Sequence, residues 1–340
     1  MAGDPAARAE QQAMPQPVRL LVGDIGGTHA RLGVMDVAGA DRRLLALRRY
    51  ACADAADLAA LLRRFQTDEA ASGAATATVA VLAIAGVVEG DQLLSRNLPW
   101  PVSLTATRRD AGMSALYLIN DFEALAWAVP GLAAAQRRTL DGTDSPAALP
   151  LPALVLGPGT GLGAAVVVDV DGAPRVLPSE AGQAALAPGT ALEIELLRVL
   201  QARFGHVACE RVVSGPGLVN LYQALAEVRG CAAQAKTPAD VVAAVHQGEA
   251  LASECVALFC QWWGGVAGDL ALTFRARAVC LAGGLTVHLG DALRQGGFRQ
   301  RFADKGVLSE ALRQVPVCTV EDDTLALVGA AAWYVARRPG

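Results

Sequence analysis

Apolar residues in the first half of the chain fall into short runs separated by stretches of helical spacing. Runs of strand length cover residues 19–22, 30–37, 79–85 and 116–119. Between the second and third runs, Leu58, Leu61, Leu62 and Phe65 fall on one helical stripe, for which Asp54 is the expected cap. Residues 122–129 predict another helix, stopped by Pro130-Gly131. The pattern predicts strands alternating with helices after an opening hairpin.

The second half of the chain is richer in helical spacing. The residues that open its predicted helices are Thr190, with Glu193 completing a capping-box pattern, Ser214 and Thr237. Residues 249–274 form a long apolar helical region, expected to be interrupted at Gly264, Gly265 and Gly268. Strands at 278–282 and 315–320 follow, and either Asp322 or Asp323 can cap a last helix that runs to about Val335.

One turn in the first half has the composition of a phosphate site. An apolar run delivers Asp24 to the turn Gly26-Gly27-Thr28, and a second strand leads away. Glycines permit positive φ and a close approach to a ligand, and consecutive N–H groups can cradle phosphate oxygens. Asp24 can hold a hydrated Mg²⁺ beside them. The arrangement suits a nucleotide, and an ordinary Gly-rich hairpin is the alternative if the segment is taken alone.

The same plan recurs at residues 153–172. An apolar strand precedes Gly157-Pro-Gly-Thr-Gly161-Leu-Gly163, and a Val-rich strand follows. Both stretches run strand, Gly-Thr turn, strand, and both close on Asp-Val and a further turn. Two related hairpins of phosphate type indicate an ancient duplication, with a nucleotide held between two halves.

The second copy also fits the dinucleotide-binding fingerprint. Gly159, Gly161 and Ala164 have its spacing, and Glu180 lies near the place of its ribose-binding acid. That fingerprint requires a helix after the glycines. Residues 165–170 are instead rich in valine, which favours a strand, and they lack a helical stripe. The dinucleotide-binding interpretation therefore fails on its context.

Composition narrows the class of protein. The 340 residues, of which 53% are hydrophobic and 18% charged, are enough for about two domains with substantial cores. A formal net charge of −4 and the lack of a dense Lys/Arg run give no support for nucleic-acid binding. Apolar runs also fall short of the roughly 20 residues of a membrane span.

Cysteine usage and the N-terminal residues favour a cytoplasmic protein. The seven cysteines are scattered, mostly in apolar segments, and form no CxxC pair, so we expect buried reduced thiols rather than a zinc or redox site. Residues 1–17 are rich in Ala, Gln and Pro and lack an apolar core region. They predict a disordered tail rather than a secretory signal.

Taken in order, six motifs resemble those of bacterial glucokinases, which belong to the actin/hexokinase/Hsp70-like superfamily. The motifs are Asp24-Ile-Gly-Gly-Thr28, Ile119-Asn-Asp-Phe122, Gly159-Thr-Gly-Leu-Gly163, Pro178-Ser-Glu-Ala-Gly182, Glu210-Arg-Val-Val-Ser-Gly-Pro-Gly217 and Ala282-Gly-Gly284. The resemblance runs from about Val18 to Val335. It implies an α/β fold of two actin-like (ribonuclease H-like) domains flanking a deep cleft. The smaller domain would comprise residues 18–131 and 321–340, and the larger would comprise residues 132–320.

The resemblance implies how a sugar would be bound and activated. Asp121 would be the general base that takes the proton from the sugar 6-hydroxyl as it attacks the γ-phosphate of ATP, and a helix N-cap is the alternative for this residue. Asn120, Glu180 and Glu210 would hold sugar hydroxyls, although Glu210 can also be an ordinary surface acid beside Arg211. Asn97 would belong to a short loop on the sugar side.

The resemblance also implies a nucleotide site. Gly26, Gly27 and Thr28 would meet the phosphates of ATP from one half, and Gly159, Thr160 and Gly161 would meet them from the other. Asp24 would hold Mg²⁺ through water. Gly283 and Gly284 would let the adenosine lie flat against the backbone. These glycines and Asp24 follow apolar strands, and ligands of open α/β sheets bind at the carboxyl ends of strands.

The sugar side departs from the family more than the nucleotide side does. Members usually carry His three residues after the first sugar-binding Glu, where this chain has Gln183. Gln183 cannot ionise, and the loss of one neutral hydrogen bond costs about 0.5–1.5 kcal/mol, or roughly three- to tenfold in affinity. Residues 184–186, Ala-Ala-Leu, replace a Val-Asp-Phe type of sequence, and His29 stands where Asn is common.

The predicted function is phosphorylation of glucose at its 6-hydroxyl, dependent on ATP and Mg²⁺, by a cytoplasmic enzyme. No nucleic-acid or membrane partner is expected, and the homodimer common in the family is implied. Two alternatives stay open. One is a kinase for another hexose, such as an N-acetylated hexosamine, and the other is a sugar-binding pseudokinase or regulator with little turnover.

Overall fold

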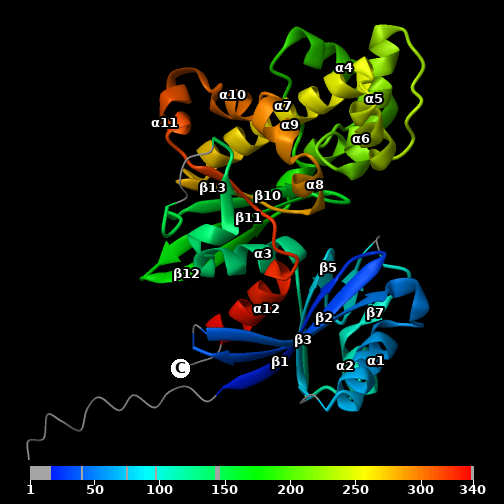
Figure 1. Cartoon of the computed structure of the whole chain (residues 1–340), viewed down its shortest axis with the longest axis vertical. Helices are drawn as coiled ribbons and strands as arrows, with labels where there is room; N and C mark the ends of the chain where they lie inside the picture. The colour runs from blue at the N-terminus through cyan, green and yellow to red at the C-terminus, as the bar shows by residue number, and fades with distance from the viewer. Residues whose placement is uncertain (1–16, 40, 74–75, 96–97, 142–145, 338–340) are drawn as a thin grey trace, which may run out of the picture. The chain divides into compact units, whose positions relative to one another are not determined.

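The computed structural model describes residues 17–337 except 40, 74–75, 96–97 and 142–145 (Figure 1). The chain divides into two compact units. Unit 1 contains the described residues up to Ala124 together with those from Thr324 onward, and unit 2 is Leu125–Asp323. Each unit is an α/β body with its own sheet and its own apolar core.

The main sheet of unit 1 has five strands. In spatial order they are β3 (Asp41–Ala51), β2 (His29–Ala38), β1 (Val18–Ile25), β4 (Val79–Ile84) and β8 (Ala115–Ile119). The first three strands pair antiparallel, and β1, β4 and β8 pair parallel. A second, small sheet joins β5 (Val87–Glu89), β6 (Gln92–Leu94) and β7 (Val102–Ser103). The predicted opening hairpin is confirmed as β1 and β2.

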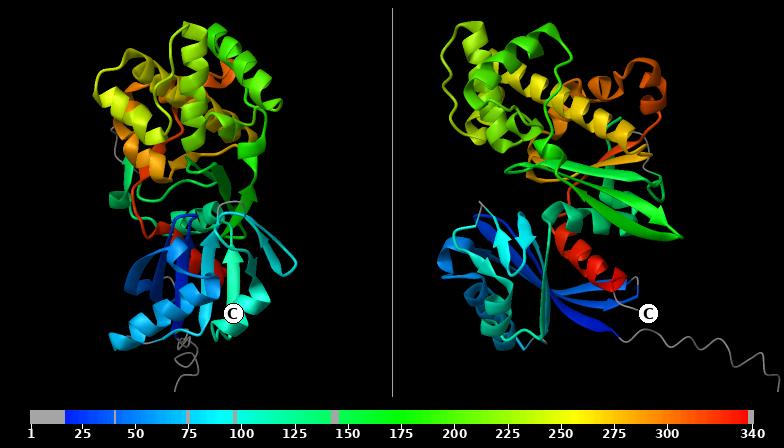
Figure 2. Two further views of the ribbon diagram at one scale, coloured as in Figure 1. Left: turned by 90° about the vertical axis from the view of Figure 1, so that its right-hand side faces the viewer. Right: turned by 180° about the vertical axis from the view of Figure 1, so that it is seen from behind.

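Helices cover both faces of this sheet (Figures 1 and 2). Helices α1 (Leu58–Ala71) and α2 (Leu104–Asp110) lie on one face, and α12 (Leu325–Ala336) lies on the other, against β1 and β4. Helix α3 (Asp121–Ala128) follows β8. The alternation of side chains along the strands explains why both faces are apolar: Leu21 and Leu32 pack in the cluster that includes α1, while Gly33 lies under Leu327 of α12.

The sheet of unit 2 repeats this plan. Its strands in spatial order are β12 (Ala173–Ser179), β11 (Leu162–Val170), β10 (Ala153–Pro158), β13 (Ala278–Leu281), β14 (Val317–Val320) and β9 (Arg137–Thr139). The first three strands are antiparallel, and β10, β13 and β14 are parallel, as in unit 1. The two Gly-rich hairpins therefore hold equivalent places. Residues 165–170 are strand, which confirms that the dinucleotide-binding interpretation was to be rejected.

Helices make up most of the rest of unit 2. They are α4 (Ala191–Phe204), α5 (Gly215–Arg229), α6 (Pro238–His246), α7 (Ala250–Thr273), α8 (Gly284–His288), α9 (Gly290–Gln295), α10 (Phe298–Ala303) and α11 (Ser309–Arg313). The predicted caps Thr190, Ser214 and Thr237 are confirmed, since each side chain accepts a hydrogen bond from a backbone N–H three residues on. Short 3₁₀ turns lie at Cys52–Asp54, Val129–Gly131, Ala134–Gln136, Ala181–Gln183, Cys209–Arg211 and Gly306–Leu308.

The predicted interruption of the long apolar helix is wrong. Helix α7 is continuous through Gly264, Gly265 and Gly268. A Cβ atom on Gly264 would lie 2.2 Å from the carbonyl oxygen of Phe298, and one on Gly268 would lie 2.3 Å from that of Phe302. The glycines thus permit α10 to pack closely on α7 rather than breaking the helix. By length and composition α7 could cross a membrane, but 72% of its apolar window is buried inside the protein, as in a core helix.

Two predicted caps are also wrong. The side chain that caps α1 belongs to Asp57, which accepts from Ala60 N–H at 2.7 Å, whereas Asp54 lies in the preceding 3₁₀ turn. Helix α12 starts after Thr324, without a side-chain cap, rather than at Asp322 or Asp323. Both errors have one cause: apolar spacing locates a helix, but the cap depends on where the backbone leaves the extended conformation.

Candidate functional site

The turn after β1 is held by hydrogen bonds on both sides. Gly26 N–H donates to the carbonyl of His29, and Cys52 N–H donates to the carbonyl of Thr28, both at 2.9 Å. The Cys52 thiol donates to the carbonyl of Gly26 at 3.2 Å. Gly26, Gly27 and Thr28 are exposed, so a phosphate group can reach this turn at the carboxyl end of β1.

Asp24 precedes this turn and is half-buried. Its Oδ2 atom lies 3.1 Å from Nη1 of Arg31, its register partner on β2. The ion pair fixes the carboxylate at the edge of the Gly-rich turn. Mg²⁺ usually keeps several waters and binds through one or two carboxylates and substrate phosphates, so a single carboxylate at a phosphate-type turn fits that ion.

Asn120 and Asp121 stand where β8 ends and α3 begins. The side-chain oxygen of Asn120 accepts from the N–H groups of Phe122 (2.9 Å) and Glu123 (3.1 Å), which caps the helix. Oδ1 of Asp121 also accepts from Phe122 N–H, at 3.0 Å. The cap therefore does not depend on Asp121 alone. Asp121 is half-buried in the first turn of the helix.

Strand pairing brings Asp24 and Asp121 to one edge of the unit 1 sheet. β1 pairs in parallel with β4, and β4 pairs in parallel with β8, so the carboxyl ends of all three strands meet there. β1 and β8 are two strand spacings apart, which is roughly 10 Å. The edge therefore holds a phosphate-type turn and a carboxylate at a distance that a substrate can span.

The corresponding turn of unit 2 lies against a helix N-terminus. Gly159 N–H donates to the carbonyl of Gly161, and the carbonyl of Gly159 accepts from Gly215 N–H, both at 2.8 Å. Gly215 is the first residue of α5, which has 15 residues. The positive end of its dipole favours an anion at this turn. The sequence predicted a helix start and a family motif at Ser214-Gly215 but no anion site there, although the run Gly215-Pro216-Gly217 was an available signal.

Gly283 and Gly284 lie beside this turn. β10 and β13 are parallel, with Leu156 opposite Leu281, and Ala282 N–H donates to the carbonyl of Leu156 at 3.0 Å. Gly283 has a φ of +99°, which L side chains rarely adopt, and a Cβ atom there would lie 3.0 Å from the carbonyl oxygen of Pro158. The two Gly-containing turns are therefore neighbours at the carboxyl edge of the unit 2 sheet.

The two predicted sugar acids approach the same end of β11. Glu180 follows β12, whose last residue, Ser179, is the register partner of Ala164. Glu210 lies on the 3₁₀ turn Cys209–Arg211, and its Oε2 atom would be 2.7 Å from a Cβ atom on Gly161. Glu180 is exposed and Glu210 is half-buried. The structure thus brings the Glu210 carboxylate to the phosphate-type turn and the backbone of Glu180 to the same end of β11.

Gln183 is bonded to Glu180 through the backbone and to the side chain of His206. Its N–H donates to the carbonyl of Glu180 at 2.9 Å, in the 3₁₀ turn Ala181–Gln183. Its own carbonyl oxygen lies 3.0 Å from Nε2 of His206, so that ring nitrogen donates. The Gln183 residue is exposed. Asn97, the remaining predicted sugar ligand, lies outside the described residues.

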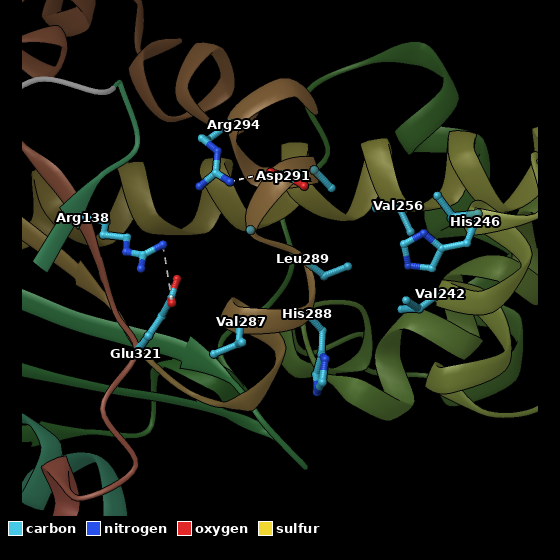
Figure 3. Close-up of a pocket in the computed structure, with 13 residues that line it drawn as sticks. Arg138, Val242, His246, Val256, Val287, His288, Leu289, Asp291, Arg294 and Glu321 are labelled. Atoms are coloured by element: carbon cyan, nitrogen blue, oxygen red, sulfur yellow. Dashed lines mark hydrogen bonds and ion pairs between the residues drawn. The ribbon is translucent and has the colours of Figure 1, made fainter.

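A cavity of about 330 Å³ adjoins α8 (Figure 3). Val242 and His246 of α6 line one end, and Val287 and His288 of α8 line the middle. At the other end Nη1 of Arg138 lies 3.9 Å from Oε2 of Glu321. The cavity combines apolar side chains with charged groups and imidazoles, so it can receive a small organic ligand that carries polar groups. No group of three or more His, Cys, Asp or Glu side chains that could hold a metal occurs within the described residues.

Comparison with known proteins identifies relatives over nearly the whole chain. A family profile described as Glucokinase matches residues 21–337. The chain is 39% identical to a glucokinase of Aromatoleum aromaticum over 318 residues, which is 92% of this chain and 93% of that protein. It is also 39% identical to a glucokinase-like protein of Xylella fastidiosa over 338 residues, covering 96% and 99% of the two chains.

Solved structures show the same fold. A glucokinase from an Antarctic psychrotroph superposes with a TM-score of 0.81 at 33% identity and covers 94% of this chain and 99% of its own. A ROK-family glucokinase from Streptomyces griseus, in complex with glucose and AMPPNP, gives a TM-score of 0.61 at 20% identity, with 93% and 98% covered. These neighbours are sugar kinases of the actin-like fold, which confirms the predicted fold class.

Proposed function

The chain belongs to the glucokinase family of hexose kinases, and from this premise we propose that it transfers the γ-phosphoryl group of ATP to the 6-hydroxyl of glucose in the cytoplasm. One observation carries the proposal. A half-buried carboxylate, Asp121, and a phosphate-type turn share one sheet edge in unit 1, and unit 2 repeats the sheet plan with its own turn. A neighbour of the same fold was solved in complex with glucose and AMPPNP, which is an analogue of ATP.

Asp121 is proposed as the general base. The oxygen of the sugar 6-hydroxyl attacks the γ-phosphorus, its proton passes to the Asp121 carboxylate, and ADP leaves. Asn120 supports this role because it supplies two hydrogen bonds that cap α3. With its side-chain oxygen occupied by backbone N–H groups, Asn120 is left to bind a sugar through its amide NH₂ group.

Glu180 and Glu210 are proposed to bind sugar hydroxyls. Each carboxylate accepts from two hydroxyls, and hydrogen bonds to charged groups contribute about 1.5–3 kcal/mol each. Their approach to one end of β11 supports the proposal. Asn97 and Gln183 are proposed to complete the sugar site.

The nucleotide is proposed to bind both phosphate-type turns, Gly26-Gly27-Thr28 and Gly159-Thr160-Gly161, with adenosine against Gly283 and Gly284. The cavity beside α8, the helix that begins at Gly284, supports this placement, since its valine side chains offer apolar surface to a base. Asp24 is proposed to hold Mg²⁺ through water, and the ion, when bound, neutralises charge on the phosphates. We also propose a homodimer, which light scattering tests.

A coupled assay for glucose 6-phosphate tests the function. Purified protein with ATP, Mg²⁺ and glucose up to tens of millimolar is expected to turn over. A panel of mannose, glucosamine and N-acetylated hexosamines gives kcat/KM for each sugar. If another hexose gives a higher kcat/KM than glucose does, that hexose is the preferred substrate. If no sugar is turned over appreciably but one of them raises the Tm of the protein, the result would favour the pseudokinase alternative. The presence of Gln183 in place of the family's His is the reason for considering that alternative.

Asp121→Asn tests the base. The variant is expected to keep its fold and its ATP binding but to lose about 10²-fold or more in kcat, because the amide cannot accept the proton. Near-wild-type kcat in this variant would reduce Asp121 to a helix cap. Asn120→Asp is the matched control for the cap, because it keeps a side-chain acceptor at the helix N-terminus. Its Tm is therefore expected to stay close to that of the wild type.

A further inference from the structure

A strap of seven residues, 184–190, connects Gln183 to α4. It has no helix or strand of its own, only an isolated bridge between Ala185 and Ala208, and most of it is exposed. Its first half pairs with the segment that carries Glu210: Cys209 N–H donates to Ala184 at 2.8 Å, and Leu186 N–H donates to Val207 at 2.9 Å. The place of the strap therefore sets the spacing between the Glu180–Gln183 turn and Glu210.

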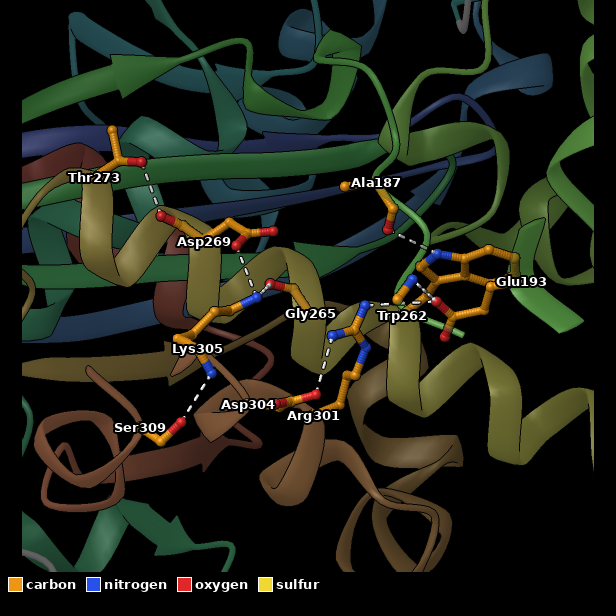
Figure 4. A network of polar contacts seen from close by, with 11 residues as sticks. Ala187, Glu193, Trp262, Gly265, Asp269, Thr273, Arg301, Asp304, Lys305 and Ser309 are labelled. Atoms are coloured by element: carbon orange, nitrogen blue, oxygen red, sulfur yellow. Dashed lines mark hydrogen bonds and ion pairs between the residues drawn. The ribbon is translucent and has the colours of Figure 1, made fainter. Parts of the chain in front are cut away.

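The second half of the strap is held by three side chains, Glu193, Trp262 and Arg301, which are called the clamp below (Figure 4). The indole Nε1 of Trp262 donates to the carbonyl of Ala187 at 3.3 Å. The Glu193 carboxylate accepts from Gly189 N–H, and Nη2 of Arg301 lies 3.5 Å from Oε2 of Glu193. Glu193 has 0% and Trp262 1% of its surface exposed.

Arg301 also contacts the strap directly. A Cβ atom on Gly189 would lie 1.7 Å from Nη2 and 2.1 Å from Cζ of Arg301. The guanidinium group therefore packs onto the backbone of Gly189, and only glycine permits this approach. The Gly189 amide is thus held on one side by the Glu193 carboxylate and covered by the guanidinium group.

The start of α4 does not require this arrangement. The cap of α6 is made by Thr237 and an exposed Asp240, with no buried charge. Glu193, by contrast, is fully buried, and its Oε1 atom has no hydrogen-bond partner in the part of the chain that the structure describes. A buried ion pair contributes little net stability against apolar side chains of similar size. Here the ion pair instead fixes the position of one backbone amide, that of Gly189.

We propose that Glu193, Trp262 and Arg301 are positioning residues, which hold the strap and thereby place Glu180 and Gln183 for hexose binding. The inference rests on the proposed function in one respect, that Glu180 and Gln183 bind the sugar. None of the three touches the phosphate-type turns through a contact described above. Loss of the clamp is therefore expected to weaken binding of the hexose and to spare ATP.

A control residue lies two positions after α10. Nζ of Lys305 lies 2.7 Å from Oδ1 of Asp269 and 3.1 Å from the carbonyl oxygen of Gly265, so Lys305 joins the segment after α10 to α7 (Figure 4). These bonds go to α7 and not to the strap. Lys305→Met thus reports the cost of loosening the helix pair alone.

Steady-state kinetics of four full-length variants test the proposal. Trp262→Phe and Arg301→Met are expected to raise KM for glucose about three- to tenfold, the effect of one lost hydrogen bond, with KM for ATP within about twofold of wild type. Arg301→Lys is expected to recover part of the loss, because it keeps the charge beside Glu193. Lys305→Met is expected to lower Tm without changing KM for glucose. Parallel shifts in the two KM values would overturn the proposal.

Amide hydrogen exchange separates the clamp from the activity. Exchange at residues 184–190 is expected to rise about tenfold in Trp262→Phe, which keeps an aromatic ring but removes the donor, and to stay unchanged in Lys305→Met. Unchanged exchange in Trp262→Phe would overturn the clamp. If the wild-type protein phosphorylates no hexose, the proposed function fails, and the exchange data still decide whether the strap is held by these residues.

Discussion

Burial divides the seven cysteine thiols into two chemical classes. Cys231 is exposed, and the other six are buried. Desolvation raises the pKa of Cys209 to about 11 and that of Cys260 to about 12, and it raises the pKa of Cys255 further. Since the thiolate is the nucleophile, these groups are unreactive at neutral pH both for lack of access and for lack of ionisation.

One thiol per chain is therefore expected to react with a disulfide reagent such as Ellman's at pH 8. The remaining six are expected to react only after unfolding in denaturant, because unfolding gives the reagent access to them. Cys231→Ser is expected to abolish the fast phase. Two or more fast thiols in the native protein would contradict the buried arrangement, and mass spectrometry of the labelled peptides identifies them.

At the residue scale, local sequence rules predicted helix caps but not the bonds between distant side chains. Thr190 was predicted as a cap and accepts from Glu193 N–H at 3.1 Å, which confirms it. Glu193 was expected to complete a capping box at the start of α4, but its carboxylate contacts Gly189 and Arg301 instead. Arg301 is 108 residues away along the chain, and no periodicity carries such a contact.

At the scale of the element, two neighbouring glycines have different roles. Gly157 lies in β10, and Gly159 lies in the turn that follows. A Cβ atom on Gly157 would lie 1.6 Å from the carbonyl oxygen of Ala282, the residue that follows β13, because β10 and β13 approach closely there. A Cβ atom on Gly159 would meet nothing within 4 Å. The first glycine is required by the sheet, and the second leaves space that a ligand can occupy.

Gly157→Ala and Gly159→Ala are therefore expected to fail in different ways. Gly157→Ala forces a backbone shift and is expected to cost at least about 1–3 kcal/mol in the free energy of unfolding, measured in urea. Gly159→Ala is expected to stay within about 0.5 kcal/mol of wild type, while raising KM for ATP severalfold. Equal losses of stability in the two variants would contradict the packing role of Gly157. An unchanged KM for ATP in Gly159→Ala would mean that this turn does not bind the nucleotide.

Elements were predicted well where the apolar period was long and clear, and less well where packing decided. The hairpins at both phosphate-type turns and the starts of α4, α5 and α6 followed from local composition. The continuity of α7 did not, because the role of Gly264 depends on α10, which packs against it. A glycine in a sequence does not say whether it breaks a helix or admits a neighbour.

At the scale of the whole molecule, unit 1 is assembled from both ends of the chain. Its sheet is complete before residue 120, but one face of that sheet is covered by α12, from residues 325–336. Leu327 is fully buried there, and its Cδ2 atom would be 3.2 Å from a Cβ atom on Gly33 of β2. Asp24 and Asp121 thus belong to a unit that depends on the last helix, while unit 2 has a continuous chain and a separate core.

Leu327→Ala is accordingly expected to destabilise unit 1 selectively. Removing a buried Leu typically costs about 2–5 kcal/mol, so the amides of β1 and β4 are expected to lose protection from hydrogen exchange while those of α7 keep theirs. Val328→Ala, at the adjacent half-buried position, is expected to have a smaller effect. Leu221→Ala, at a fully buried position of α5, is expected to give the reverse pattern, with unit 2 exchanging faster.

The comparison between Leu327→Ala and Leu221→Ala shows whether the two units unfold independently or together. If each variant loosens only its own unit, the duplication of the sheet plan has left two cooperative bodies, and each can open without the other. If both variants raise exchange everywhere by the same factor, the chain unfolds as one cooperative body. The selective result is expected, because Leu221 belongs to the apolar core of unit 2, whereas Leu327 packs on the sheet of unit 1.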